Sequence, residues 1–237
     1  MEPYRDAARV YDLFYAEKDY RAEVAEVAEI VEARCPGARS LLDVGCGTGA
    51  HLEWFARRYE HAEGVEPSAR MIEQATMARP GLLVYPGEMR TFRLADRFDA
   101  VTCLFSAIGY MTTEADLRAA IANMASHLTP GGVLVVEGWV EPAQWAAGRA
   151  SAGAVVGDDV AAARVVLSGR DGNVSTLEMR YVLATLEGFE HVTEEHVMGL
   201  FTRDQYRAAF EAAGLGYERT DGLTGRGVHI GVNRDGG

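Results

Sequence analysis

The stretch LLDVGCGTGAH, residues 41–51, combines a short apolar run, one acid and three glycines within five positions. The apolar residues around Asp43 suit a buried strand, and a helical pattern follows at 50–59. Glycines at positions 45, 47 and 49 remove side chains where the backbone could approach a ligand at a helix N-terminus. The stretch by itself fits an ordinary turn, a dinucleotide loop or a pocket for another ligand.

Short apolar runs alternate with helical patterns on both sides of this stretch. Continuous apolar runs such as AVTCLF and GVLVVE are typical of strands that are covered on both faces. The alternation predicts an α/β fold with a doubly wound, mostly parallel, Rossmann-like sheet. The expected strands are 40–44, 62–66, 82–85, 98–104 and 132–137, and the expected helices are 21–34, 50–59, 68–79 and 113–128.

The pattern changes after residue 138. Two strand-like runs flank Asp171-Gly172, a dipeptide typical of hairpins, and HVTEEHVMGLF resembles a further strand. We therefore expect an antiparallel β excursion at 139–200 after the fifth strand, for substrate binding, dimerisation or both. The main domain, 1–138 with 201–237, gains a helix and two final strands, 215–220 and 227–233, for seven strands in all.

Composition excludes several classes of protein. The 237 residues are 48% hydrophobic and 24% charged, with a net charge of −12, whereas nucleic-acid-binding proteins normally carry a basic face. No apolar run approaches the length of a membrane span. Cys35, Cys46 and Cys103 show neither metal-ligand nor redox spacing. We expect a cytoplasmic protein with a small-molecule substrate, no metal, and no nucleic-acid or membrane partner.

Three acids bear on the ligand of the glycine loop. Glu66 ends the second expected strand, where an acid can bind two ribose hydroxyls, and Glu88 follows the third. These two do not separate NAD from S-adenosylmethionine (SAM), because both cofactors contain adenosine. Asp43, inside the first strand, suits an ammonium group better than a pyrophosphate.

Four segments resemble the motifs of class I SAM-dependent methyltransferases. LLDVGCGTGAHL is similar to their first motif, VEPSARMIEQA to the second, LTPGGVLVVE to the fifth-strand motif and FTRDQYRAAFEAAGL to the late helix. The resemblance implies a seven-stranded methyltransferase sheet with SAM as cofactor. It places Asp43 at the methionine amino end and Glu66 at the ribose. The full set that it implies for the cofactor is Tyr11, Asp43, Gly45, Gly47, Glu66, Met71, Glu88, Met89 and Phe105.

A closer resemblance covers most of the chain and is weakest at 138–195. ARVYDLFYAEKDYRAEV, GEMRTFRL, FDAVTCLFSAIGYM and GRGVHIGV are similar to N-methyltransferases of dTDP-3-amino-3,6-dideoxyhexoses, the desosamine and mycaminose type of antibiotic biosynthesis. This implies N-methylation of a nucleotide-linked amino sugar by a homodimer. A neutral amine would attack the sulfonium methyl in line, so that positioning supplies most of the catalysis and no strong base is obligatory.

The same resemblance indicates residues for the acceptor. Tyr15 and Tyr110 match tyrosines of the family and are expected to line the reacting centre. With Tyr4, Tyr11 and Tyr20, Tyr15 would fit either a segment that closes over the cofactor or an apolar helix face. A sugar-nucleotide diphosphate needs cationic partners. The expected substrate-binding residues are Tyr15, Tyr110, Trp139, Arg164, Arg180, His196 and Arg226, and Arg226 is the first choice for the diphosphate.

Departures from the family pattern fall in the expected substrate region. GWVEPAQW replaces a Trp-Trp-Phe-Pro-Glu run, Leu223 and Thr224 replace Pro and Ser, and Arg180 replaces a histidine. Another small amine or a hydroxyl is therefore an alternative acceptor. An NAD-dependent oxidoreductase and a non-catalytic SAM-binding module are more distant alternatives.

Overall fold

The seven-stranded sheet is mixed, with five parallel strands and one reversed hairpin at its edge. The computed structural model describes residues 7–222 and 225–234, so that Tyr4, Leu223 and Thr224 lie outside the described part. The strand order is β10-β11-β5-β4-β1-β2-β3, and β11 runs antiparallel to both of its neighbours. The predicted fold class is confirmed. The strands are β1 Ser40–Val44, β2 His61–Glu66, β3 Leu83–Pro86, β4 Phe98–Cys103, β5 Leu128–Glu137, β10 Leu215–Thr220 and β11 Val228–Asn233.

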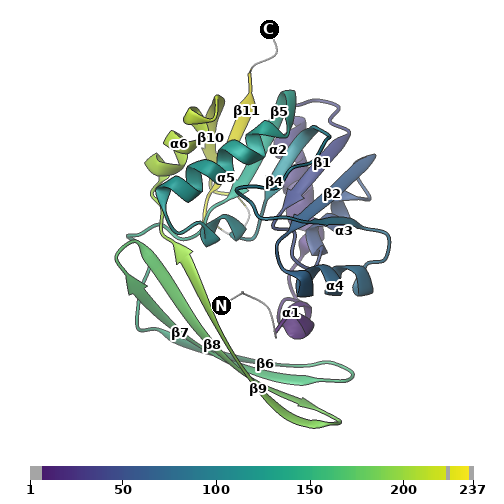
Figure 1. Ribbon diagram of the computed structural model, residues 1–237, viewed down its shortest axis with the longest axis vertical. Helices are drawn as coiled ribbons and strands as arrows, with labels where there is room; N and C mark the ends of the chain where they lie inside the picture. The colour runs from purple at the N-terminus through teal and green to yellow at the C-terminus, as the bar shows by residue number, and fades with distance from the viewer. Residues whose placement is uncertain (1–6, 223–224, 235–237) are drawn as a thin grey trace.

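Helices cover both faces of this sheet (Figure 1). Threonine side chains cap two of these helices: the Thr113 side chain accepts a hydrogen bond from the Asp116 N–H, and Thr202 forms a capping box with Gln205. The helices are α1 Ala8–Phe14, α2 Tyr20–Glu32, α3 Ala50–Phe55, α4 Ala69–Ala78, α5 Glu114–Ser126 and α6 Arg203–Ala212, with a short 3₁₀ helix, η1, at Ala107–Tyr110.

Successive residues of the central strands β1 and β5 enter different cores. Leu42 and Leu134 pack in one cluster with residues of α5 and α6, whereas Leu41 and Val135 pack in another with residues of α2 and α3. Because strand side chains alternate between faces, a strand that is buried on both must be apolar at consecutive positions. This explains the continuous apolar runs in the sequence.

Most predicted boundaries agree with the structure to within two residues, and two were wrong by four. The strand expected at 132–137 begins at Leu128, because Phe98 of β4 pairs with Leu128 before the register shifts and Ala100 pairs with Val133. The helix expected at 50–59 ends at Phe55, with Ala56 as its C-cap. Turn residues inside LTPGG therefore belong to an irregular strand rather than to a loop.

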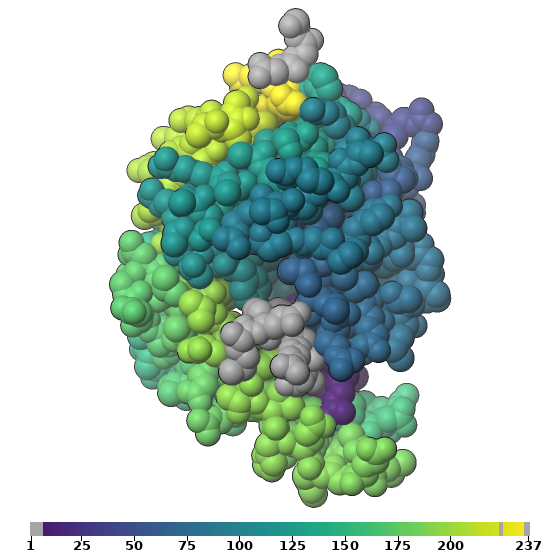
Figure 2. Space-filling model, in the orientation of Figure 1, coloured from purple at the N-terminus to yellow at the C-terminus, as the bar shows by residue number. Residues whose placement is uncertain are grey.

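The excursion after β5 is a four-stranded antiparallel sheet in the order β6-β7-β8-β9. It lies below the α/β unit, and its surface forms a separate green lobe (Figures 1 and 2). The predicted Asp-Gly hairpin joins β7 to β8, and Gly172 has a φ of 56°. The strands are β6 Ala150–Val156, β7 Ala161–Asp171, β8 Val174–Thr185 and β9 Gly188–Gly199.

Within residues 7–222 and 225–234, no helix is long and apolar enough to cross a membrane, and no group of His, Cys, Asp and Glu could hold a metal ion.

His229 is a buried histidine beneath the late helix. It is 3% exposed, its ring stacks 3.8 Å from that of Tyr206, and its Nδ1 lies 2.9 Å from the Tyr217 hydroxyl. Burial, with Arg219 and Arg203 nearby, lowers the pKa of His229 to about 3. The folded state therefore holds this histidine neutral at a pH where the unfolded chain protonates it.

We expect His229 to make the free energy of unfolding fall as the pH drops from about 6.5 towards 3. The unfolded histidine binds a proton below about 6.5 and the folded one does not, which corresponds to about 2 kcal/mol at pH 5. Urea unfolding of wild type, His229→Gln and His191→Gln at pH 5 and pH 7.5 measures this loss. The loss should shrink in His229→Gln and persist in His191→Gln, since His191 is exposed. An equal loss in all three proteins would contradict the assignment.

Candidate functional site

A large cavity, about 540 Å³, opens at the carboxyl ends of the parallel strands. This is where ligands bind in doubly wound folds, since the loops after β1, β2 and β4 meet there. Of the predicted cofactor residues, all except Asp43 line it: Tyr11, Gly45, Gly47, Glu66, Met71, Glu88, Met89 and Phe105. Tyr110 lines it too, and β9 adds Glu195 and Val197.

Glu66 connects two loops at the centre of the site. Its Oε2 accepts a hydrogen bond from the Gly47 N–H at 3.0 Å, and its Oε1 accepts one from the Ser68 N–H at 2.9 Å. The side chain is only 6% exposed. Ser68 in turn caps α4, so that one carboxylate fixes the glycine loop against the start of the next helix.

The glycine loop has a conformation that favours glycine. Gly45 and Gly47 have φ values of 74° and 58°, in the left-handed region. A Cβ on Gly45 would lie 2.8 Å from the Ala107 Cβ, whereas one on Gly47 would meet no atom within 4 Å. The loop backbone therefore borders open space at Gly47, where a ligand can lie against it.

A second, smaller cavity of about 40 Å³ lies behind this loop and contains Asp43. Asp43 is 2% exposed and accepts a hydrogen bond from the Thr102 hydroxyl at 2.8 Å. Burial raises the pKa of Asp43, while His51 and Thr102 oppose that rise. A cationic ligand group here would give the buried carboxylate a partner of opposite charge.

Lys18 is a residue that the sequence argument missed. It is the only lysine in the chain, and its side chain is 12% exposed. Its Nζ forms an ion pair with Glu23 and lies 4.7 Å from the centre of the Phe105 ring, a wall of both cavities. Glu23 also contacts His51 Nε2 at 2.8 Å. The single lysine of a chain rich in arginine was the signal that could have drawn attention to it.

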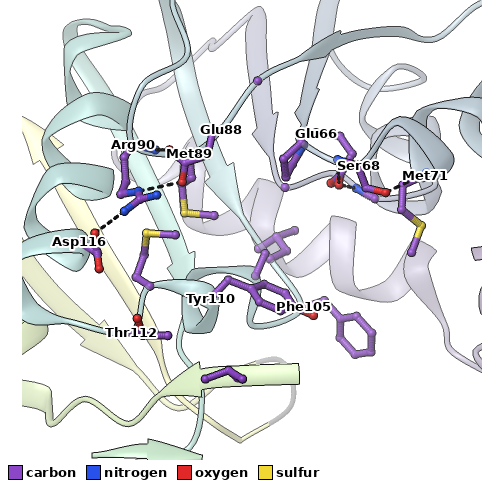
Figure 3. Close-up of a pocket in the computed structure, with 18 of the residues that line it drawn as sticks. Glu66, Ser68, Met71, Glu88, Met89, Arg90, Phe105, Tyr110, Thr112 and Asp116 are labelled. Carbon is purple, nitrogen blue, oxygen red and sulfur yellow. Dashed lines mark hydrogen bonds and ion pairs between the residues drawn. The ribbon is translucent and has the colours of Figure 1, made fainter. Parts of the chain in front are cut away.

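The end of the large cavity away from Glu66 and Met71 contains a network of ion pairs (Figure 3). Arg90 pairs with Glu88 at 2.8 Å and with Asp116 from α5. Met89, from the same segment, is 7% exposed and lines the cavity beside them. An apolar side chain beside hydrogen-bonding groups suits the flat ring of an adenine.

The two tyrosines expected at the reacting centre have different positions. Tyr110 lines the large cavity, and its hydroxyl lies 2.7 Å from Nδ1 of His196, a buried residue of β9. Tyr15 does not line that cavity; its ring packs against Tyr11 at 4.8 Å and Phe105 at 5.0 Å, which do. The structure thus brings Tyr15 next to the cavity wall.

Arg226 and Trp139 lie together beyond the ends of β4 and β5. The Arg226 guanidinium stacks 4.7 Å from the Trp139 ring and donates to the Ser106 hydroxyl at 3.0 Å. The Trp139 indole N–H donates to Ser175 in β8 at 3.0 Å. Ser106 and its neighbour Phe105 have positive φ values, 63° and 51°, and such strain is concentrated at functional sites.

The other two candidate arginines occupy opposite faces of the antiparallel sheet. Arg164 lies on the face that contacts α1, with its guanidinium 4.4 Å from the Phe14 ring. Arg180 precedes Tyr181 in β8, so its side chain points to the other face, where it is 73% exposed and pairs with Glu178 at 2.6 Å. Arg180 does not line the large cavity, but its partner Glu178 pairs in register with Glu195 of β9, which does, so the two lie on the same face of the sheet.

Comparisons with known proteins identify the family of this chain. Residues 41–132 match the family described as "Methyltransferase domain". The chain is 44% identical to dTDP-3-amino-3,4,6-trideoxy-alpha-D-glucopyranose N,N-dimethyltransferase of Streptomyces venezuelae, covering 96% of this chain and 98% of the relative. The chain belongs to the SAM-dependent sugar N-methyltransferases. It is also 42% identical to dTDP-3-amino-3,6-dideoxy-alpha-D-glucopyranose N,N-dimethyltransferase of Streptomyces fradiae, covering 96% and 91%.

Solved structures of sugar N-methyltransferases show the same architecture. The crystal structure of Streptomyces venezuelae DesVI superposes with a TM-score of 0.90 at 44% identity, covering 96% of this chain and 98% of that one. SAM-bound CalS10, an amino pentose methyltransferase from Micromonospora echinaspora, gives 0.84 at 42% identity, covering 94% and 96%. SAM is thus the cofactor of this enzyme, and the two cavities contain groups that fit it: acids for the ammonium and ribose, and open backbone at Gly47.

We expect Lys18 to bind the carboxylate at the methionine end of SAM, because a zwitterion needs a cation beside the anion of Asp43. Lys18→Met should weaken SAM binding by about tenfold and bring its affinity close to that of decarboxylated SAM. Calorimetry with both ligands on wild type, Lys18→Met and Arg118→Met measures the two affinities. Arg118 lies on the exposed surface of α5 and serves as the control. An equal loss for both ligands in Lys18→Met would mean that Lys18 is structural only.

Proposed function

We propose that this enzyme transfers methyl groups from SAM to the amino group of a dTDP-linked deoxy amino sugar in the biosynthesis of an antibiotic or related natural product. The observation that carries the proposal is the identity of 39–44%, over 96% of the chain, to three enzymes named as dTDP-amino-sugar N,N-dimethyltransferases. Two of them act on 3-amino sugars and the third, from Saccharopolyspora spinosa, on a 4-amino sugar.

Positioning accounts for most of the catalysis that we propose. When bound, SAM supplies an electrophilic methyl group on a sulfonium. Asp43, Glu66 and the glycine loop orient the cofactor, and the aromatic wall formed by Tyr11 and Phe105 limits the access of water. Tyr110 presents a hydroxyl to the cavity and can accept a hydrogen bond from the acceptor amine. An amine needs only its own lone pair to attack the methyl carbon.

The proposed partner of the diphosphate is Arg226. Its guanidinium is partly exposed and is anchored by Ser106 and Trp139, so that its remaining donors can form a fork to phosphate oxygens. Under this proposal Trp139 and His196 do not contact the substrate directly. Trp139 positions Arg226, and His196 positions Tyr110.

Incubation with SAM and a panel of dTDP-linked 3-amino and 4-amino sugars tests the acceptor. Mass spectrometry should show a gain of one and then two methyl groups on at least one sugar. The matching dTDP-sugar with a hydroxyl in place of the amino group should gain none. Absence of any mass gain from the amino sugars would contradict the proposed function.

Arg226→Ala should raise the KM for the nucleotide sugar by about 10- to 100-fold, since it removes charge-assisted hydrogen bonds. Arg226→Lys keeps the charge without the fork and should have an intermediate KM. Arg118→Ala serves as the surface control. An unchanged KM in Arg226→Ala would show that the diphosphate binds elsewhere.

We further propose that the outer face of the antiparallel sheet joins two copies of the chain in a homodimer. Val165, Leu167 and Val182 on that face are 55%, 50% and 38% exposed, and they lie beside the Arg180–Glu178 ion pair, which pairs in register with Val165 and Leu167. The same sheet also helps to roof the active site, since Glu195 and Val197 line the large cavity. Under this proposal the excursion at 139–200 serves both purposes, whereas 1–138 and 201–237 bind SAM.

Val165→Glu with Leu167→Glu should convert a dimer into a monomer, because like charges would face each other across the interface. Light scattering after size-exclusion chromatography measures the mass. A wild-type monomer would contradict the dimer, and a dimer retained in the double variant would contradict this interface.

We also infer a cytoplasmic enzyme, supported by three cysteines that are free thiols.

A further inference from the structure

Arg164 lies at the centre of a row of residues that crosses the antiparallel sheet. In register it pairs with Gly153 on β6 and with Tyr181 on β8, so that all three positions belong to the same face of the sheet. That face contacts α1 and the residues after it. Gly153 has no side chain, and the Phe14 ring approaches to 4.0 Å from the position where its Cβ would be.

The guanidinium of Arg164 is held among aromatic side chains of the protein. It stacks 4.4 Å from the ring centre of Phe14 and 5.8 Å from that of Tyr15. Burial lowers the pKa of Arg164, and the nearby hydroxyls of Tyr15 and Tyr181 more than offset this effect. The space enclosed by this cluster is about 10 Å³. Such a space holds a water molecule at most, so a diphosphate cannot reach the guanidinium without moving α1.

Tyr15 transmits the position of Arg164 to the cofactor site. Its ring packs edge-on against Phe105 and tilted against Tyr11, and both of these residues are walls of the two cavities. Phe105 also holds a strained backbone conformation, with a φ of 51°, and its N–H donates to the buried Glu137 at 2.7 Å. A displacement of the Tyr15 ring would therefore change the shape of the wall beside the methyl donor.

We infer that Arg164 is a positioning residue: it fixes Tyr15 against the aromatic wall of the cofactor site and does not bind the sugar-nucleotide diphosphate. The kinetic part of this inference rests on the proposed acceptor, whereas the cofactor-binding part does not. Through Arg164, the antiparallel sheet contributes to methyl transfer with a residue that touches neither the cofactor cavity nor the acceptor.

A double-mutant cycle tests the inference. Arg164→Met, Tyr15→Phe and the double variant are compared with wild type in kcat, in the KM for the nucleotide sugar and in the affinity for S-adenosylhomocysteine. Arg164→Met should lower kcat by about tenfold and change the KM for the sugar by less than about threefold. The double variant should be no worse than the poorer single variant, because both changes break the same contact.

Two further variants separate positioning from folding. Arg164→Lys keeps the charge but loses the planar guanidinium that stacks on the Phe14 and Tyr15 rings, so it should resemble Arg164→Met in kcat. Arg118→Met, on the exposed surface of α5, serves as the arginine-to-methionine control. Thermal melting reports whether each variant is folded at the assay temperature. A kcat restored to the wild-type value in Arg164→Lys would show that charge alone matters and would overturn the inference.

A different result would assign Arg164 to the diphosphate. In that case Arg164→Met would raise the KM for the sugar by tenfold or more at unchanged kcat, and its effect would add to that of Tyr15→Phe in the double variant. If no sugar is methylated at all, the proposed function fails, but the affinities for S-adenosylhomocysteine still decide the inference. Weaker binding in Arg164→Met that is not additive with Tyr15→Phe supports it, and unchanged affinity in both single variants overturns it.

Discussion

The carboxylate of Glu66 accepts hydrogen bonds from the N–H groups of Gly47 and Ser68, and the site is arranged around that bridge. Two loops from neighbouring parallel strands end at the same edge of the sheet, and without a common partner their backbones would be free to separate. A buried acid that satisfies one N–H from each loop prevents this. We propose that the same acid binds the ribose, in which case the structural and ligand-binding requirements of Glu66 coincide.

The proposed methionine end of the site contains charges that are costly to bury. Asp43 lies within a strand, and Lys18 lies between aromatic rings with Glu23 as its ion-pair partner. Under this proposal, a zwitterionic ligand end brings an opposite charge to both residues. Such an arrangement is consistent with catalysis that relies on orientation rather than on a base.

Most of the main sheet could be predicted because its signals are local. Apolar runs bounded by turns, the Thr113 and Thr202 caps and the order of the motifs specify strands and helices without any knowledge of their contacts. The start of β5 could not be predicted, because Leu128 becomes a strand residue only through its pairing with Phe98. The β6 strand, ASAGAVV, is too rich in small residues for its sequence pattern to separate it from a loop.

The sequence by itself determined the methyltransferase sheet, the glycine loop and the acids that follow the strands, because each depends on residue type and spacing along the chain. Only the tertiary structure decided the parts of Arg164 and Arg180. The two arginines lie on adjacent strands of one sheet, yet one points towards Tyr15 and the other towards solvent. The side-chain direction changes at every residue of a strand, so the register between β7 and β8 decides which face each arginine occupies. That register depends on contacts between residues far apart in the chain.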